Sequence, residues 1–233
     1  LFISAVASSL AGATCANAVN IASLPSSFLN ESTACMNDDY TLTTPGGCGS
    51  LYVSGEDKVY KYSSAGNECI GITLSNVSTP LMGFQVYYGC PGSGGSCIAF
   101  YGGASVISGS ATLSLPGTYY IVIDSCAPPS SVGYDLFIQS FGTGASNDLP
   151  CQAPLLSTGV YTLGNNSCSS GSGEPAAPLC WSAGVMNTVW FKGVVGAAGT
   201  AYIQTQTLTL TDTQVEVFKG TCSGLISMTG NCN

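Results

Sequence analysis

Two acidic pairs, Asp38-Asp39 and Glu56-Asp57, are the densest groups of chemically active side chains in this sequence. Paired carboxylates can hydrolyse glycosides when they face each other across a substrate. Neighbouring residues on a strand point to opposite faces, however, so neither pair is arranged for that chemistry. The chain has no histidine, so no Ser-His-Asp or Cys-His arrangement can form within it. We therefore expect a protein that is not an enzyme.

The same positions offer oxygen ligands for a cation. Calcium binds six to eight oxygens from carboxylates, amides and backbone carbonyls. The candidate ligands are Asn37, Asp38, Asp39, Glu56 and Asp57. An alternative explanation is that these residues form turns, since Asn and Asp side chains bond to their own backbone. Calcium is thus the one cofactor candidate, and no other cofactor is predicted.

The low charge excludes two classes of partner. Only 7% of the residues are charged, and twelve acidic residues outnumber four lysines in a chain without arginine. Nucleic-acid binding depends on neutralising phosphates with clustered Lys and Arg, which four scattered lysines cannot provide. No apolar run reaches the 18 residues of a membrane-spanning helix. We expect neither nucleic-acid binding nor membrane insertion.

The chain contains twelve cysteines, and their spacing does not match common zinc sites. Disulfides are the better explanation, and they persist in oxidising compartments. The sequence therefore predicts an extracellular or cell-surface protein.

A tandem repeat runs through the chain. Cys15, Asp57-Lys58-Val59-Tyr60 and the segment 84–90 recur in the same order as Cys151, Asn187-Thr188-Val189-Trp190 and the segment 215–222. Leu136-Phe137-Ile138-Gln139 also resembles Leu1-Phe2-Ile3-Ser4. The order of the matches predicts two copies of one unit, placed head to tail.

The repeat predicts three segments. Residues 1–10 match the last strand of a preceding repeat plus a linker, residues 11–142 form a complete β-sandwich repeat, and residues 143–233 form a following repeat that lacks its last strands. Two explanations stay open. The residues could belong to a longer array, which we favour, or to a subunit whose terminal strand completes a neighbour's sheet.

Short runs rich in Val, Ile, Tyr, Phe and Thr predict strands, separated by Gly, Pro, Ser and Asn clusters. The pattern indicates an all-β fold of tandem antiparallel, jelly-roll-like β-sandwiches stapled by disulfides. The expected strands are 58–62, 70–74, 83–88, 119–124, 189–192, 200–205 and 214–218.

Cysteine spacing suggests several pairings, although sequence alone does not fix connectivity. Cys90 with Cys97 would close a hairpin, while Cys35–Cys48 and Cys168–Cys180 would clamp a loop in each copy. Cys69 and Cys126 occur only in the first copy and could pair with each other. The full set of disulfide candidates is Cys35, Cys48, Cys69, Cys90, Cys97, Cys126, Cys168, Cys180, Cys222 and Cys232.

A family resemblance follows from several segments: CANAVNIASLP, GEDKVYKY, VYYGCPGSGGSC and LPGTYYIVIDS in the first copy, and NDLPCQAPLL, NTVWFK and DTQVEVFKGTC in the second. They resemble the pre-peptidase C-terminal-like domains repeated in large secreted or cell-surface proteins of Bacteroidota-type bacteria. The resemblance covers nearly the whole chain and implies non-catalytic β-sandwiches attached to peptidases, adhesins or filament-like surface proteins.

Two further surface features concern carbohydrate. Asn30, Asn76 and Asn165 fit the N-glycosylation pattern. Tyr52, Tyr88, Tyr101 and Trp181 are candidates for stacking on sugar rings, whereas the remaining strand aromatics are expected in the core.

The sequence favours a structural or adhesive segment of a large extracellular repeat protein, forming a stalk or cell-surface filament. Its expected partners are neighbouring repeats or identical subunits in a filament, with surface glycans as further candidates. The alternative is a substrate-binding or carbohydrate-binding accessory domain of a secreted peptidase or glycan hydrolase.

Overall fold

The structure is a computed structural model that describes residues 10–128, 130–169, 174–175, 187–196, 199–206 and 213–228. The chain divides into two compact units, Leu1–Thr143 and Gly144–Asn233, which we call unit 1 and unit 2. The predicted terminal strand at residues 1–4 lies outside the described residues. No helix among the described residues is long and apolar enough to span a membrane.

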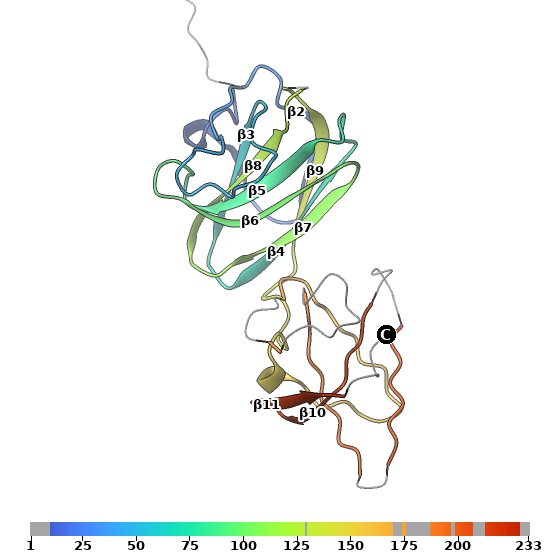
Figure 1. Ribbon diagram of the computed structural model, residues 1–233. Helices are drawn as coiled ribbons and strands as arrows, with labels where there is room; N and C mark the ends of the chain where they lie inside the picture. Colours follow the sequence, from blue (N-terminus) through green and yellow to red (C-terminus); the bar gives the residue numbers. More distant parts are fainter. Residues whose placement is uncertain are drawn as a thin grey trace, which may run out of the picture. The chain divides into compact units, whose positions relative to one another are not determined.

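Unit 1 consists of two sheets (Figure 1). The five-stranded sheet has the order β1-β3-β8-β5-β6. Its strands are β1 (Val19–Ile21), β3 (Lys58–Ser64), β5 (Met82–Tyr88), β6 (Ser96–Gly103) and β8 (Gly117–Ser125). All of its pairings are antiparallel except that of β1 with β3. Strand β8 lies between β3 and β5 and is therefore central.

The second sheet of unit 1 has four strands in the order β2-β9-β4-β7. They are β2 (Ser26–Ser32), β4 (Glu68–Ser75), β7 (Ile107–Leu113) and β9 (Gly133–Ser140). Every pairing in this sheet is antiparallel. Strand β9 lies between β2 and β4, so the last strand of the unit is central here.

The core of unit 1 lies between these sheets. Alternate side chains point inward because successive strand residues face opposite sides. Ile70, Ile72 and Leu74 of one sheet pack in the same cluster as Phe84, Ile121 and Ile123 of the other. Burial of side chains from two facing sheets defines a β-sandwich. Unit 1 thus confirms the all-β prediction, and the expected strands 58–62, 70–74, 83–88 and 119–124 fall within β3, β4, β5 and β8.

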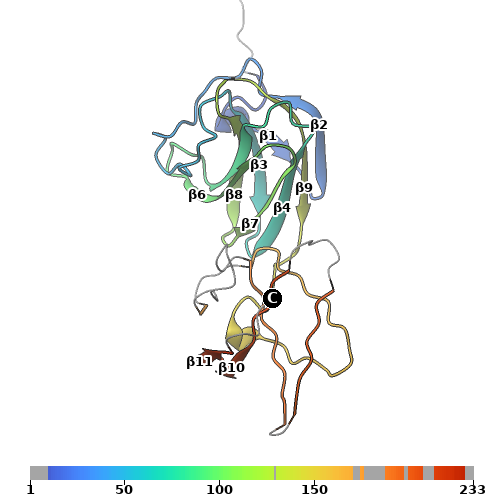
Figure 2. The ribbon, with the colours of Figure 1, turned by 45° about the vertical axis from the view of Figure 1, so that its right-hand side comes forward.

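The outer face of the five-stranded sheet is also covered. The segment 33–57, which connects β2 to β3 and which we call the cover loop, places Tyr40 against Val59, Tyr87 and Val122. Antiparallel sheets commonly leave one face to solvent. Here the cover loop buries the part of that face around Val59, Tyr87 and Val122, and Figure 2 shows the loop beside the sheet. The first six residues of β5 are consequently buried on both faces.

Unit 2 contains less regular structure among its described residues. They include a 3-10 turn, η2 (Pro150–Gln152), and a two-stranded sheet of β10 (Phe218–Thr221) and β11 (Gly224–Ser227). Leu155 and Lys192 form an isolated parallel bridge. The strand expected at 189–192 is reduced to the bridge residue Lys192, no strand residue lies within 200–205, and 214–218 has strand structure only at Phe218, so these three predictions are wrong.

Candidate functional site

A pair of buried carboxyl groups lies under the cover loop. Asp57 directly precedes β3 and Asp124 lies near the end of β8, and the β3–β8 register places them opposite each other, one step beyond Lys58 and Ile123. Both residues are completely buried. Burial of one carboxylate is costly and burial of two adjacent ones more so, because like charges repel and water is excluded.

Backbone N–H groups hold one oxygen of each carboxyl. Asp57 Oδ2 accepts hydrogen bonds from the amides of Asp39 and Tyr40 at 2.7 and 2.8 Å. Asp124 Oδ1 accepts from the amide of Gly55 at 3.0 Å and from the amide of Ser125. These bonds anchor the middle of the cover loop through Asp57 and its end through Asp124.

The other two oxygens, Asp57 Oδ1 and Asp124 Oδ2, receive no donor from the surrounding described residues. Burial, followed by repulsion from Asp124, raises the pKa of Asp57. Burial also raises the pKa of Asp124, although the Ser125 and Gly55 amides oppose that shift. A proton shared by the two carboxyls removes one of the two buried negative charges. It also provides a hydrogen bond between the two oxygens that have no other donor.

Backbone bonds fix the neighbouring loop residues. The Asp57 amide donates to the Asn37 carbonyl at 2.9 Å, and the Glu56 amide donates to the Ser130 carbonyl at 2.6 Å. Both carboxyls are therefore bonded to backbone groups, and the loop residues around them are bonded to other backbone groups. The pair is thus held by the main chain of the packed unit. This arrangement can hold a proton and a loop, but it presents neither carboxyl to solvent.

The expected calcium ligands come together only in part. Asp39 and Asn37 contact Asp57 through backbone atoms, while the carboxyls of Asp38 and Asp39 are exposed. In the described part of the chain, no three His, Cys, Asp or Glu side chains are grouped closely enough to hold a metal ion. Calcium binding stays a prediction. Sequence reasoning missed Asp124, although its position at the end of an apolar strand was visible.

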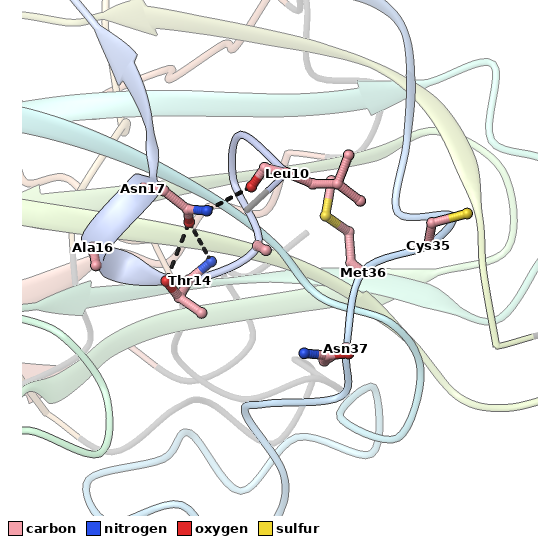
Figure 3. A pocket seen from close by; sticks show the side chains of 8 residues that line it. Leu10, Thr14, Ala16, Asn17, Cys35, Met36 and Asn37 are labelled. Carbon is pink, nitrogen blue, oxygen red and sulfur yellow. Dashed lines mark hydrogen bonds between the residues drawn. The ribbon is translucent and has the colours of Figure 1, made fainter. Parts of the chain in front are cut away.

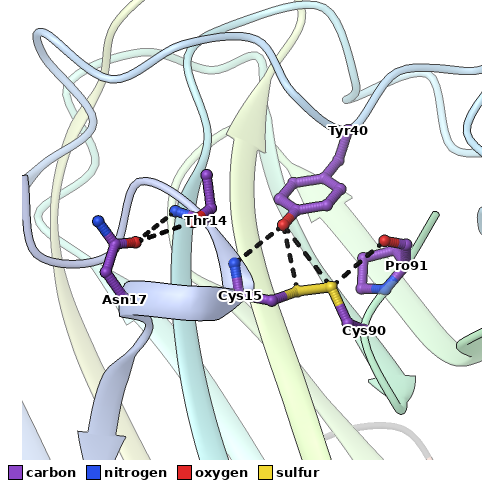
Figure 4. Close-up of a disulfide and its surroundings, with 6 residues drawn as sticks. All are labelled: Thr14, Cys15, Asn17, Tyr40, Cys90 and Pro91. Carbon is purple, nitrogen blue, oxygen red and sulfur yellow. Dashed lines mark hydrogen bonds between the residues drawn. A yellow bond between two sulfur atoms is a disulfide. The ribbon is translucent and has the colours of Figure 1, made fainter. Parts of the chain in front are cut away.

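Two disulfides hold the cover loop and its neighbours to the sheet. Cys15 pairs with Cys90, joining the 3-10 turn η1 (Cys15–Asn17) to the end of β5. The Tyr40 hydroxyl lies over this bond, 3.1 Å from Cys15 Sγ, and accepts the Cys15 amide at 3.0 Å (Figure 4). Cys48 of the cover loop pairs with Cys97 of β6. The loop is therefore fixed covalently at Cys48 and by the hydrogen bonds of the Tyr40 hydroxyl.

These bonds correct the expected pairings. Cys90 does not pair with Cys97, because the hairpin register places Cys97 opposite Tyr87 instead. Cys35 does not pair with Cys48, and Cys69 does not pair with Cys126, since Cys35 and Cys126 are free thiols. Cys69 and Cys168 each take part in a disulfide. Cys151 and Cys222 are bonded to each other. Cys180 and Cys232 lie outside the described residues.

These disulfides establish the compartment, because such bonds persist where the surroundings are oxidising. The protein is extracellular or periplasmic.

A pocket of about 550 Å³ lies between η1 and the start of the cover loop (Figure 3). Asn17 at its wall is fully engaged, since its Oδ1 accepts from the Thr14 amide and its Nδ2 donates to the Leu10 carbonyl. Met36 and the Cys35 thiol complete the opposite wall. Cys35 is the one titratable side chain of this lining, so the pocket offers no acid and base pair.

The carbohydrate candidates have mixed surroundings. Asn30, Asn76 and Asn165 are exposed. Tyr88 packs against Tyr119 with ring centroids 5.2 Å apart, and Tyr101 packs against Phe84 at 5.3 Å. The rings of Tyr88 and Tyr101 are therefore engaged with the core of unit 1. Trp181 lies outside the described residues.

No protein-family model matches the chain, and no curated protein sequence matches it. Among solved structures, the periplasmic inhibitor of g-type lysozyme PliG from Aeromonas hydrophila aligns with 53% of this chain and 95% of its own. The sequence identity is 15% and the TM-score is 0.36.

Proposed function

We propose that this chain is a non-catalytic structural or adhesive segment of a larger extracellular protein, in which repeated disulfide-stapled units form a stalk or surface filament. We also propose that its units are pre-peptidase C-terminal-like repeats, which the sequence resembles. The observation that carries it is the recurrence of one local structure in both units.

The recurrent structure begins with a 3-10 turn. In unit 1, Asn17 Oδ1 accepts the Thr14 amide at 2.7 Å, and in unit 2, Gln152 Oε1 accepts the Leu149 amide at 3.1 Å. Both turns are followed by alanine, Ala18 and Ala153. The same side-chain cap therefore closes both turns with different residue types.

A disulfide then ties each turn to a cysteine just after a strand, Cys90 after β5 and Cys222 after β10. Cys15–Cys90 spans 75 positions and Cys151–Cys222 spans 71. Phe218 and Gly220 precede Cys222 as Tyr87 and Gly89 precede Cys90, with one residue inserted before the second cysteine.

Backbone contacts extend the correspondence. The Val59 amide donates to the Gly12 carbonyl at 2.7 Å, as the Trp190 amide donates to the Asn147 carbonyl at 2.8 Å. The parallel pair Asn20 and Lys61 corresponds to Leu155 and Lys192. These contacts match Trp190 with Val59, one residue away from the Tyr60 match expected from sequence. They support two copies of one unit, which suit a quasi-linear assembly.

Immunogold electron microscopy of producing cells tests this function. Antibodies against the purified 233-residue chain are expected to label thin projections in regularly spaced rows, because an array presents each epitope once per repeat. Labelling confined to dispersed protein in the medium, or retention of the chain on a polysaccharide column, would contradict a stalk and favour an accessory binding domain.

A further inference from the structure

We infer that Cys35 is a cross-linking site, at which unit 1 forms a disulfide with a cysteine of a further repeat of the same type. The inference goes beyond the proposed function, because such a bond can join repeats in a stalk or in a dispersed protein. Cys35 is an exposed free thiol. The observation that makes it a site is the state of its counterpart in unit 2, Cys168, which takes part in a disulfide.

The two cysteines occupy the same position of the same turn. The turn of unit 1 covers residues 33–36 and that of unit 2 covers residues 166–169. In each turn the amide of the fourth residue donates to the carbonyl of the first, at 3.0 and 3.2 Å respectively. The cysteine is the third residue in both, and its φ is positive in both, 67° at Cys35 and 57° at Cys168.

The residue before each turn also matches. Ser32 Oγ accepts a hydrogen bond from the Ala34 amide at 3.0 Å, and Asn165 Oδ1 accepts one from the Ser167 amide at 2.9 Å. Ser and Asn side chains commonly bond to the backbone two residues further along at the start of a turn. The correspondence therefore extends over five consecutive residues and does not depend on the cysteines alone.

Backbone preference does not explain a cysteine at this position. A positive φ at the third residue of a turn favours Gly or Asn, because a Cβ crowds the backbone in the left-handed conformation. Both units nevertheless place a cysteine there, and in unit 2 its sulfur is used in a disulfide. The bonded state of Cys168 thus identifies this turn as a disulfide position of the repeat.

The partner of Cys35 lies outside the two units. The cysteines of unit 1 other than Cys35 and Cys126 take part in disulfides. Cys126 is a half-buried free thiol, so it is not bonded to Cys35. Because Cys35 is free in a structure that contains both units, its partner belongs to a further repeat. A tethered repeat would present its cysteines at a high effective concentration.

The bond forms by two exchange steps with a small disulfide, such as oxidised glutathione. The Cys35 thiolate attacks one sulfur of that disulfide, and one small thiol leaves. The thiolate of the partner cysteine then attacks the Cys35 sulfur, and the second small thiol leaves. Two protein thiols are thereby oxidised to one disulfide, while the small disulfide is reduced to two thiols. Oxidising compartments supply such disulfides.

Disulfide mapping of the native protein from producing cells tests the inference. N-ethylmaleimide added before extraction caps free thiols, and chymotrypsin without reductant releases residues 30–40, in which Cys35 is the one cysteine. We expect mass spectrometry to find this peptide bonded to a cysteine peptide of a further repeat. The matched control is Cys126, whose peptide 121–134 should carry N-ethylmaleimide.

Non-reducing gel electrophoresis distinguishes the two sources of the partner. A repeat in a second polypeptide gives a larger species that disappears on reduction, whereas a repeat in the same polypeptide leaves the apparent mass nearly unchanged. Either result supports the bond. Cys35→Ser should abolish the linked peptide and any larger species, and Cys126→Ser should leave both unchanged.

Three results would overturn the inference. Cys35 could carry N-ethylmaleimide, be bonded only to glutathione, or be bonded to Cys126, Cys180 or Cys232 of its own chain. The bond and the stalk fail separately. A mapped bond in protein dispersed in the medium supports the cross-link and contradicts the stalk, whereas labelled projections with a capped Cys35 do the reverse.

Discussion

Asp57 and Asp124 face each other across the β3–β8 pair, both completely buried, with one oxygen of each carboxyl left without a donor. In the folded protein their pKa values are raised above the ordinary value near 4, chiefly by burial. The folded protein therefore keeps protons on these carboxyls at pH values where the unfolded chain has already released them. Because the unfolded state then binds fewer protons, the contribution of this pair to stability is greatest below about pH 4 and is lost as pH rises through the raised pKa values.

Asp57→Asn tests this relationship. The amide keeps an oxygen for the Asp39 and Tyr40 amides and offers an N–H to Asp124, so one buried charge is removed without losing the loop anchor. We expect urea unfolding of the wild type to lose up to roughly 1.4 kcal/mol for each pH unit between pH 5 and 8. The variant should show a clearly flatter profile. Asp39→Asn, an exposed neighbour, is the control, and identical slopes in Asp57→Asn and wild type would refute the shared proton.

The disulfide of Cys15 and Cys90 should contribute strongly to unit 1. It closes a loop of 75 positions, for which chain entropy gives about 4 kcal/mol of stabilisation. The double change Cys15→Ser and Cys90→Ser should lower the free energy of unfolding by roughly that amount in denaturant titrations. Tyr40 loses its sulfur contact in the same variant, which adds to the loss.

The matched control for that experiment is Cys35→Ser. Cys35 is exposed and free, so its replacement should change stability by less than about 0.5 kcal/mol. A comparable loss in both variants would mean that serine itself, and not the lost cross-link, causes the effect.

Two buried tyrosine hydroxyls and the half-buried Glu31 carboxylate form a hydrogen-bonded chain that gives an ordered prediction. The Tyr60 hydroxyl donates to Glu31 Oε2 at 3.1 Å and lies 3.0 Å from the Tyr134 hydroxyl. Tyr60→Phe leaves the buried Tyr134 hydroxyl without this partner, whereas Tyr134→Phe leaves Tyr60 still bonded to Glu31. We expect costs of about 2 and about 1 kcal/mol respectively. Thermal unfolding of both variants checks the order, and a larger loss in Tyr134→Phe would contradict it.

Sequence patterns predicted the elements of unit 1 but not its long-range bonds. Alternation identified β3, β4, β5 and β8, because a half-buried or buried strand leaves a local signature. Cys48 and Cys97 are 49 positions apart and meet only once the cover loop folds over the sheet. Short spacing therefore suggested local pairs that the register does not permit. Asp57 was visible as part of an acidic pair, but its contact with Asp124 was not, because the two residues meet only when β3 and β8 pair.

The strand predictions in unit 2 failed for a different reason. Residues 200–205 have a strand-like composition, yet a strand exists only when a neighbour accepts its backbone hydrogen bonds. Ile203 and Tyr202 are exposed there, whereas β4 in unit 1 is held between β9 and β7. Composition reports the preference of a segment, and the presence of neighbours decides the outcome.

Gly102 in β6 allows a close approach that a side chain would prevent. A Cβ at this position would lie 2.0 Å from the Tyr52 ring, which rests on the outer face of β6, and the Tyr52 carbonyl accepts a hydrogen bond from the side-chain Nε2 of Gln85 at 2.9 Å. Gly102→Ala should therefore displace this part of the cover loop and cost about 1–3 kcal/mol. Gly103→Ala is the matched control, because its Cβ would meet only Ile107 at an ordinary 3.5 Å. Hydrogen exchange around residue 52 should rise in the first variant and stay unchanged in the second. Equal effects would show that loss of strand glycine itself, and not the Tyr52 contact, sets the stability.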